Sequence, residues 1–317
     1  MRALSPTTTG ILCLISGIAI FSVQDLILNL LSGDYPLHQA RVTRSVTAMP
    51  FLLWIVHAFD GSLSTIATRG WWKMLARGLL NFVAYTAYYL GLAALPMAET
   101  VALFFTGPLF ITLSAAILLR EKVPPAAALA VAAGFAGVLL IARPGAEGLS
   151  WTVMLPILGA AGYALAMISA RSLGRTESAA AMAFWSNACF LICALVLSAI
   201  WGTGGHEGTG DPAMAFLTRG WVMPSAWDLG LMAACGGIAA IGLTLLTQAY
   251  RAAPSATVAP FEYSFMFWGV LWGWLFWHEM PDATAWAGIA VIIGAGLYVI
   301  RQPEAPKEKA APEGAAP

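Results

Sequence analysis

The chain has 317 residues, of which 59% are hydrophobic and only 10% are charged, and its 16 basic side chains balance 16 acidic ones. Its mean hydropathy is +0.76, and in ordinary soluble proteins about a quarter of the residues are charged. A water-soluble fold could not bury this much apolar surface, and the zero net charge without a basic patch argues against a nucleic-acid partner. The composition predicts an all-α polytopic membrane protein in a lipid bilayer.

Apolar stretches long enough to cross a bilayer, about 17–25 residues each, fill most of the chain. We expect ten transmembrane helices, at 8–31, 38–58, 71–92, 97–118, 125–142, 152–170, 178–201, 228–250, 256–277 and 283–300. A long loop is expected at 202–220. Residues 302–317, rich in Ala, Pro, Lys and Glu, can bury no apolar face and are expected to form a disordered cytoplasmic tail.

The first predicted helix contains a carboxylate at membrane depth. Asp25 lies 15 residues after Gly10, about 22 Å along a helix, with Gln24 beside it and Asn29 one turn further. An ionisable group at this depth usually faces a water-filled cavity. We therefore assign Gln24, Asp25 and Asn29 to substrate binding, and Asp25 also to energy coupling. The alternative is a neutral carboxyl group that is hydrogen-bonded to a neighbouring helix.

The second predicted helix begins with two arginines three residues apart, Arg41 and Arg44, which this spacing places on one helix face. Two interpretations stay open. The guanidinium groups could extend to the membrane interface, or they could form a fork for a substrate carboxylate.

The third and eighth predicted helices carry polar stripes at helical spacing. The stripes consist of Arg77, Asn81, Tyr85, Tyr88 and Tyr89, and of Thr244, Thr247, Gln248 and Arg251. Because a lipid-facing stripe would not be polar, both should face the bundle interior, either lining a pathway or hydrogen-bonding other helices. Asn81, Tyr85, Tyr88 and Gln248 are candidates for substrate binding, whereas Arg77 and Arg251 are expected to anchor cytoplasmic helix ends.

The fourth and ninth predicted helices each contain a proline, Pro108 and Pro260, which removes a backbone hydrogen bond. Breaks in paired segments point to a transporter's binding site, but the two prolines are not at equivalent repeat positions, and simple helix kinks are the alternative. Glu262, seven residues into the ninth helix, is a candidate for substrate binding and coupling, and Tyr263 for substrate binding. Glu99, near the start of the fourth helix, is a further coupling candidate, although capping or loop contacts are the favoured role for an acidic residue at a helix end.

Three more residues complete the predicted substrate site. Trp185 and Trp268 lie inside predicted helices, beside Asn187 and Glu262 respectively, and are candidates to pack against a substrate side chain. Asn187 is a candidate for a polar contact with the substrate. The simpler interpretation for the tryptophans is packing in the bundle or at the membrane interface.

No metal, cofactor or catalytic site is predicted. Four cysteines fall inside apolar stretches, with no histidine at ligand spacing. The sequence contains no His-Glu-x-x-His pair, no Gly-x-Ser-x-Gly motif and no P-loop. A membrane-embedded enzyme and an ATP-driven pump are therefore disfavoured, and the protein is not expected to be an enzyme.

The chain contains an internal repeat. Residues 96–144 match a second segment at a shift of 158, and residues 17–21 match 159–163 at a shift of 142; the loop at 202–220 accounts for the difference. Matched positions include Pro96 with Pro254, Glu121 with Glu279, and Gly17 with Gly159. We predict two five-helix units, 8–143 and 152–301. Because five is odd, the second unit must enter the membrane from the opposite side, as in inverted-repeat transporters.

Basic residues predict the orientation. With the N-terminus inside the cell, twelve Lys and Arg lie at cytoplasmic ends and four lie outside, as the positive-inside rule requires. We expect both termini in the cytoplasm and the protein in a bacterial inner membrane.

Three stretches carry a family resemblance. They are Ala-Leu-Pro-Met-Ala-Glu-Thr from residue 94, Leu-Leu-Arg-Glu-Lys-Val from residue 118 and Gly-Phe-Ala-Gly-Val-Leu-Leu-Ile-Ala-Arg-Pro-Gly from residue 134. The chain resembles the EamA-type, ten-helix members of the drug/metabolite transporter superfamily. Arg44 stands where that family usually has an arginine. The resemblance implies two inverted five-helix units that move small metabolites, often amino acids and commonly outward.

The leading hypothesis is a secondary transporter that exports a small metabolite by alternating access, with amino acids as the favoured substrates. In this scheme Arg41 or Arg44 would bind the carboxylate, and Asp25 or Glu262 the ammonium group. The alternatives are a passive channel or facilitator and an exporter of drugs or other metabolites. The expected partners are a small-molecule substrate and the lipid bilayer; no oligomeric state is predicted.

Overall fold

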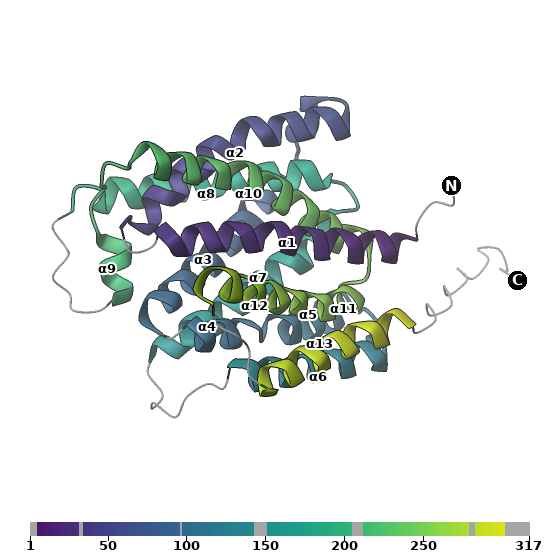
Figure 1. Cartoon of the computed structure of the whole chain (residues 1–317). Helices are drawn as coiled ribbons and strands as arrows, with labels where there is room; N and C mark the ends of the chain where they lie inside the picture. Colours follow the sequence, from purple (N-terminus) through teal and green to yellow (C-terminus); the bar gives the residue numbers. More distant parts are fainter. Residues whose placement is uncertain are drawn as a thin grey trace, which may run out of the picture.

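The computed structural model describes residues 5–31, 34–95, 97–142, 151–204, 212–278 and 283–301. Within these ranges every element is a helix (Figure 1). The elements are α1 (Pro6–Leu31), α2 (Leu37–Asp60), η1 (Leu63–Ile66), α3 (Trp71–Ala94), α4 (Met97–Phe104), α5 (Gly107–Leu118), α6 (Pro125–Ala142), η2 (Trp151–Val153), α7 (Met154–Leu173), α8 (Ala179–Trp201), α9 (Pro212–Thr218), α10 (Ala226–Ala252), α11 (Ser255–Val258), η3 (Ala259–Ser264), α12 (Phe265–Trp277) and α13 (Ala283–Arg301).

Helices lie over all ten predicted ranges, and two of those ranges are divided. The fourth consists of α4 and α5, and the ninth of α11, η3 and α12. The short helix α9 lies within the predicted loop 202–220. The predicted tail, 302–317, lies outside the described residues.

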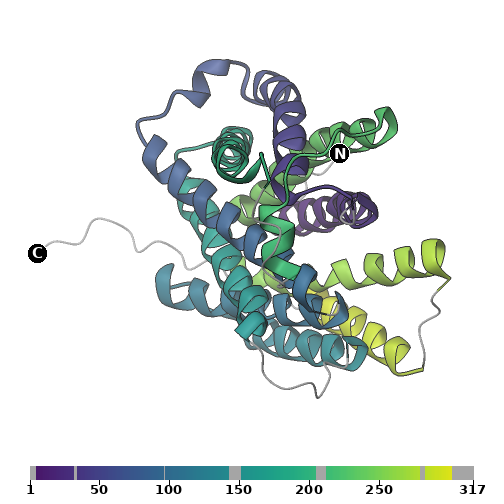
Figure 2. The ribbon, with the colours of Figure 1, turned by 90° about the vertical axis from the view of Figure 1, so that its left-hand side faces the viewer.

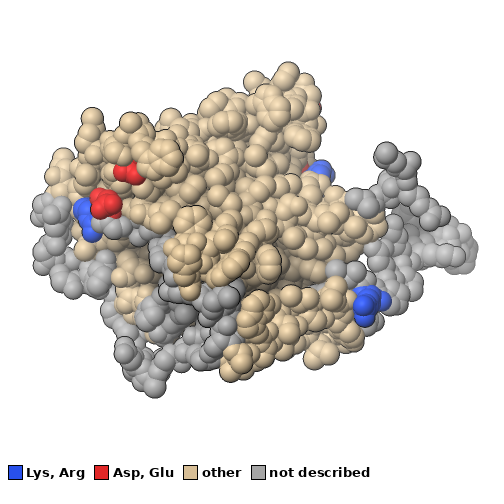
Figure 3. Space-filling view, viewed as in Figure 1, with Lys and Arg blue, Asp and Glu red and all other residues tan. Residues whose placement is uncertain are grey.

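The described helices and surface fit a membrane protein. By length and composition, α1, α2, α7, α8 and α10 can cross a bilayer, while α5 and parts of α6 and α13 form shorter apolar helices. Large apolar side chains are exposed on the outside, among them Trp54, Phe59, Ile117 and Trp227. In the view of Figure 3, the charged side chains lie at the two ends, and the broad band between them carries none. Such a band matches the hydrocarbon layer of a membrane.

The helices pack in a pattern of matching pairs. The contact of α1 with α10 corresponds to that of α7 with α3, and the contact of α2 with α10 corresponds to that of α8 with α3. Two further contacts, α2 with α8 and α6 with α13, each join a helix to its own counterpart. This pattern is unchanged when each segment is exchanged with the one five predicted spans later: α1 with α7, α2 with α8, α3 with α10, and α6 with α13. In Figure 2, α6 and α13 lie together at one edge of the bundle.

Two glycines permit equivalent close contacts. A Cβ atom on Gly17 would overlap Leu246 Cδ1, and one on Gly159 would lie 3.3 Å from the backbone nitrogen of Tyr88. Gly17 matches Gly159 in the sequence repeat, and Leu246 is 158 residues after Tyr88. Only glycine allows these helices to approach so closely.

Arg77 joins four helices inside the bundle. Its side chain is 2% exposed, and it donates to the Ala166 carbonyl (3.2 Å), the Met182 carbonyl (3.4 Å), Ser186 Oγ (2.6 Å) and Thr247 Oγ1 (3.0 Å). The expectation that Arg77 anchors a helix end is therefore wrong, because its guanidinium lies inward and connects α3 to α7, α8 and α10.

Candidate substrate cavity

A cavity of about 630 Å³ lies where α1 ends and α2 begins. Its wall comes from α1, α2, α3, α9 and α12 and is mainly apolar, and Phe216 of α9 belongs to it. Its larger polar side chains are Asp25, Tyr35, Tyr88, Tyr89 and Arg219. Small-molecule sites in proteins typically occupy about 300–1,000 Å³. The outer cavity, as we name it, is therefore large enough for a metabolite.

A second cavity of about 70 Å³ lies deeper, at mid-helix positions of α1, α3, α7 and α10. We name it the inner cavity. Both carboxylates predicted from the sequence, Asp25 and Glu262, line it. Asp25, Tyr88 and Phe265 also line the outer cavity. Asp25 therefore stands where the two cavities adjoin.

Asp25 is held by a tyrosine of a different helix. The hydroxyl group of Tyr89, on α3, donates to Asp25 Oδ1 at 2.9 Å. Its neighbour Gln24 is buried, and its side-chain oxygen accepts from Arg44 Nη1 at 3.4 Å. The polar face of α1 is thus connected to α2 and α3.

Glu262 is held by two tyrosines. The hydroxyl groups of Tyr163, on α7, and Tyr250, on α10, donate to Glu262 Oε1 at 2.9 and 2.5 Å. The glutamate belongs to η3 and is 8% exposed. Hydrogen bonds to an ionised group are stronger than those between neutral groups. This carboxylate therefore connects the second broken segment to α7 and α10.

Both broken segments contribute to the inner cavity. In the first, α4 ends at Phe104 and α5 begins at Gly107, with Pro108 in its first turn; in the second, Pro260 lies in the first turn of η3. The two prolines are not at equivalent positions, but the breaks are, because 105–106 shifted by 158 is 263–264, the end of η3. Irregular backbone is tolerated at membrane depth where it is buried in protein or lines a cavity.

Arg41 and Arg44 are buried, at 6% and 7% exposure. The Cζ atom of Arg41 lies 5.2, 5.4 and 5.8 Å from the ring centroids of Phe82, Tyr89 and Phe190. The Cζ atom of Arg44 lies 5.3 Å from that of Phe190. The interpretation that these side chains extend to the membrane interface is therefore wrong, because both guanidinium groups lie among aromatic rings inside the bundle.

The remaining polar stripe of α3 divides between the cavities and the helix contacts. Tyr85 lines the inner cavity, and its ring lies edge-on to Tyr163, with centroids 6.1 Å apart. Asn81 is 1% exposed and lines neither cavity; neither of its amide atoms has a hydrogen-bond partner among the described residues.

Two predicted tryptophans serve packing. Trp185 donates from Nε1 to the Ile66 carbonyl at 3.0 Å, which connects α8 to η1. Trp268 stacks on Trp272, with ring centroids 6.1 Å apart. Neither tryptophan lines the two cavities. The prediction that they contact a substrate therefore finds no counterpart in these cavities.

Asn187 and Tyr263 hold helices together. Asn187 Nδ2 donates to the Ser45 carbonyl at 2.9 Å, and the Tyr263 hydroxyl donates to the Val131 carbonyl at 3.1 Å. Both side chains are buried and line neither cavity. The side chains of Asn29 and Glu99 lie outside the described part of the structure.

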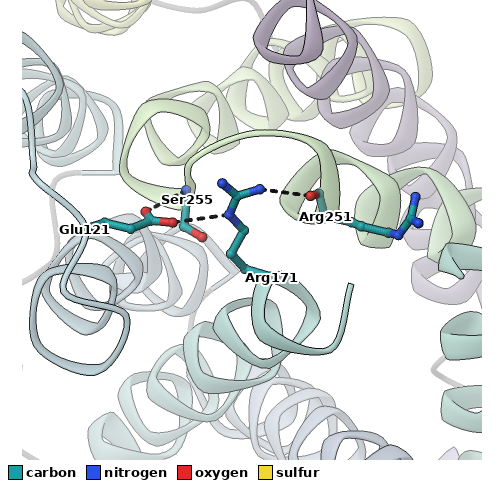
Figure 4. A network of polar contacts seen from close by, with 4 residues as sticks. All are labelled: Glu121, Arg171, Arg251 and Ser255. Atoms are coloured by element: carbon teal, nitrogen blue, oxygen red, sulfur yellow. Dashed lines mark hydrogen bonds and ion pairs between the residues drawn. The ribbon is translucent and has the colours of Figure 1, made fainter. Parts of the chain in front are cut away.

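A polar network lies at the opposite end of the bundle (Figure 4). Arg171 Nε donates to Glu121 Oε1 at 3.3 Å, the Ser255 amide donates to Glu121 Oε2 at 2.9 Å, and Arg171 Nη1 donates to the Arg251 carbonyl at 2.9 Å. Gln248, predicted as a substrate contact, instead accepts from Arg251 Nη1 at 3.4 Å. We name Glu121, Arg171, Arg251 and Ser255 the end network.

The sequence did not identify Tyr163, Tyr250 and Phe190 as site residues. Tyr163 lies at the repeat position of Phe21, which also lines the inner cavity, so the repeat was the available signal. Tyr250 lies between Gln248 and Arg251, within the segment that carries the polar stripe of α10, but it was not included in that stripe. Among the described residues, no group of three or more His, Cys, Asp or Glu could hold a metal ion, and the four cysteines are free.

Residues 8–143 match the EamA-like transporter family. The riboflavin transporter of Rhizobium johnstonii is 33% identical to this chain over 239 residues, which cover 75% of the chain and 73% of that protein. The chain belongs to the EamA-like transporter family. This EamA-like chain is also 25% identical to the pseudopaline exporter of Pseudomonas aeruginosa, over 92% of the chain and 96% of that protein.

A crystal structure has the same fold as this EamA-like protein. The two superpose with a TM-score of 0.72 at 16% sequence identity, over 92% of this chain and 96% of the other. At this identity the likeness concerns the fold alone. It supports the helical architecture that surrounds the two cavities.

Proposed function

We propose that this protein is a secondary transporter that moves a small amphipathic metabolite across the bacterial inner membrane by alternating access. Membership of a transporter family gives the general class. The observation that carries the proposal is the pair of carboxylates, half-buried Asp25 and buried Glu262, which line one cavity together with both broken helices. Discontinuous helices and ionisable groups at mid-membrane depth mark transporter binding sites.

The proposed architecture has ten membrane crossings in two inverted repeats, 8–143 and 152–301. Two observations support it: the helix contacts stay the same when each helix is exchanged with its counterpart in the other repeat, and Gly17 and Gly159 make equivalent close contacts. Helix α1 begins and α13 ends at the same end of the bundle (Figure 1). We place that end, which also carries Arg171 and the exposed Arg175, in the cytoplasm.

In the proposed cycle, the structure corresponds to a state with its large cavity toward the outside. The outer cavity lies at the end of the bundle with α9, whereas the end network joins α5, α7 and α11 at the other end. Exposure of the site to the cytoplasm would require this network to open while the helices around the outer cavity close. Such exchange between two packed arrangements is the usual form of transporter motion.

The proposed substrates are amino acids or metabolites of similar character, moved outward. An amino acid matches the available groups: carboxylates for its ammonium group, arginines for its carboxylate, and tyrosine and phenylalanine rings for its side chain. The pseudopaline exporter among the relatives supports outward transport, and the riboflavin transporter supports a metabolite as the substrate.

Counterflow in liposomes tests the function. Vesicles with purified protein are loaded with one unlabelled compound from a panel of amino acids, vitamins and other metabolites, and uptake of the labelled compound is followed. A carrier gives transient accumulation above the equilibrium level, whereas a passive channel gives only equilibration. The absence of flux for every compound would contradict the proposal, and flux of metabolites other than amino acids would refute only the substrate assignment.

A further inference from the structure

Two buried arginines have donors without acceptors. Arg41 Nη1 and the Nε and Nη2 atoms of Arg44 are buried and have no hydrogen-bond partner among the described residues. Within the same part of the chain, the ion pair observed is the one between Arg171 and Glu121, and it does not involve them. Arg44 has one long hydrogen bond, to Gln24 at 3.4 Å. The positive charge of the pair is therefore only partly compensated: Asp25 attracts Arg44 electrostatically, but neither guanidinium forms an ion pair or a full set of hydrogen bonds within the described residues.

Arg77 shows what a structural arginine looks like in this bundle. It is equally buried, but Nε, Nη1 and Nη2 all donate to carbonyl or hydroxyl oxygens. Buried charges in proteins are normally paired and hydrogen-bonded because desolvation is costly. If Arg41 and Arg44 served only to hold helices together, we would expect comparable partners. Their unused donors instead indicate a missing acceptor.

The two guanidinium groups converge on one place beside the outer cavity. Both Cζ atoms lie within 6 Å of the Phe190 ring centroid. Arg41 also lies over the ring of Tyr89, which lines the outer cavity and holds Asp25. Aromatic faces compensate part of the desolvation of a cation, but they leave the N–H donors unused and do not remove the repulsion between two like charges.

We propose that Arg41 and Arg44 bind an oxyanion, a carboxylate or a phosphate group, of the transported molecule, and that this group reaches them when Tyr89 turns away from Arg41. The planar fork of donors on each guanidinium fits the two oxygens of such a group. The body of the molecule then occupies the outer cavity, whose wall is mainly apolar. This inference rests on the proposed transport function and narrows its substrates to amphipathic anions and zwitterions.

Competition in the counterflow assay tests the inference. The probes are matched pairs with and without the oxyanion: L-phenylalanine against L-phenylalaninamide, and phenyl phosphate against phenol. In at least one pair, we expect the oxyanion to inhibit the wild-type protein at a concentration at least about tenfold lower than its partner without the oxyanion. This ratio is the one expected when hydrogen bonds to a charged group are lost. The two pairs distinguish a carboxylate from a phosphate substrate.

The variants Arg41→Gln, Arg44→Gln and their combination should lose this preference for the oxyanion. Arg175→Gln, at an exposed arginine in the turn after α7, is the matched control and should keep it. Thermal unfolding of each variant gives a second readout. Removing a charge that is only partly compensated should leave the unfolding temperature unchanged or raise it, whereas removing a structural arginine should lower it.

Two results would overturn the inference. One is a wild-type protein that transports compounds without discriminating between the members of either pair. The other is a pair of arginine variants that keep the wild-type preference, whether or not they are less stable. Either result leaves the transport function itself intact, because that function fails only if no compound shows counterflow.

Discussion

At the scale of single residues, the two carboxylates of the inner cavity are the clearest functional candidates. Each is held by tyrosine hydroxyls from other helices, Asp25 by Tyr89 and Glu262 by Tyr163 and Tyr250. A carboxylate that is held in place but lies on a cavity wall can bind a cationic group or a proton without large rearrangement. Substrate binding and proton exchange can therefore compete for the same groups.

We predict that Asp25→Asn or Glu262→Gln abolishes the response of transport to a pH gradient, because an amide cannot bind and release the proton. Proteoliposomes with an imposed pH gradient give the measurement. Asp34→Asn, at an exposed residue between α1 and α2, is the control. Variants that respond to the gradient as the wild type does, or a wild type without any response, would remove the coupling role.

Arg77 should matter for stability and not for substrate choice. Arg77→Ala would remove one donor each from Ser186, Thr247 and two carbonyl groups, and we predict destabilisation of about 3 kcal/mol, because these hydrogen bonds to a charged group are lost and a cavity remains. Thermal unfolding in detergent measures this, with Arg175→Ala as the control. An unchanged unfolding temperature would show that the four hydrogen bonds contribute little.

At the scale of helices, close contacts at glycine determine how the bundle packs. We predict that Gly17→Ala destabilises the protein by about 1–3 kcal/mol, as overpacked cores do, because the new Cβ would overlap the side chain of Leu246. Gly294→Ala is the matched control, since a Cβ atom at that position would have no described neighbour within 4 Å. Equal unfolding temperatures for the two variants would contradict this packing.

The broken helices should matter for transport. Pro260→Ala restores a backbone donor in η3 and favours a regular helix there, which would shift Glu262 relative to Tyr163 and Tyr250. We predict a several-fold lower counterflow rate with the protein still folded. Pro125→Ala, at the exposed first residue of α6, should transport at the normal rate. A normal counterflow rate in the Pro260→Ala variant would show that transport does not require the helix break.

At the scale of the whole molecule, much of the helical layout followed from the sequence. Apolar length placed helices over all ten predicted ranges, and the two segments that contain Pro108 and Pro260 are each divided into shorter helices. Depth along a helix identified Asp25 and Glu262, which the structure brings to one cavity. These features depend on local sequence, namely hydropathy, proline chemistry and the 1.5 Å rise per residue.

The features that sequence reasoning missed depend on which helices meet. Arg77 was expected at an exposed helix end, but its acceptors come from α7, α8 and α10, far away in the chain. Trp185 and Trp268 were assigned to the site from their residue type, whereas helix rotation directs them to other contacts. The tyrosines that hold Glu262 come from two helices whose approach only the packing reveals.

The most direct test of alternating access is to measure how two introduced cysteines react from the two sides of the membrane. In a variant without its native cysteines, Leu92→Cys in the outer cavity and Gln248→Cys near the end network are labelled with a membrane-impermeant maleimide, with and without a transported compound. We expect reciprocal changes: Leu92→Cys reacts from the outside, and conditions that protect it increase labelling of Gln248→Cys from the cytoplasmic side. Simultaneous labelling of both positions, from opposite sides and unaffected by the compound, would identify an open pore and contradict alternating access.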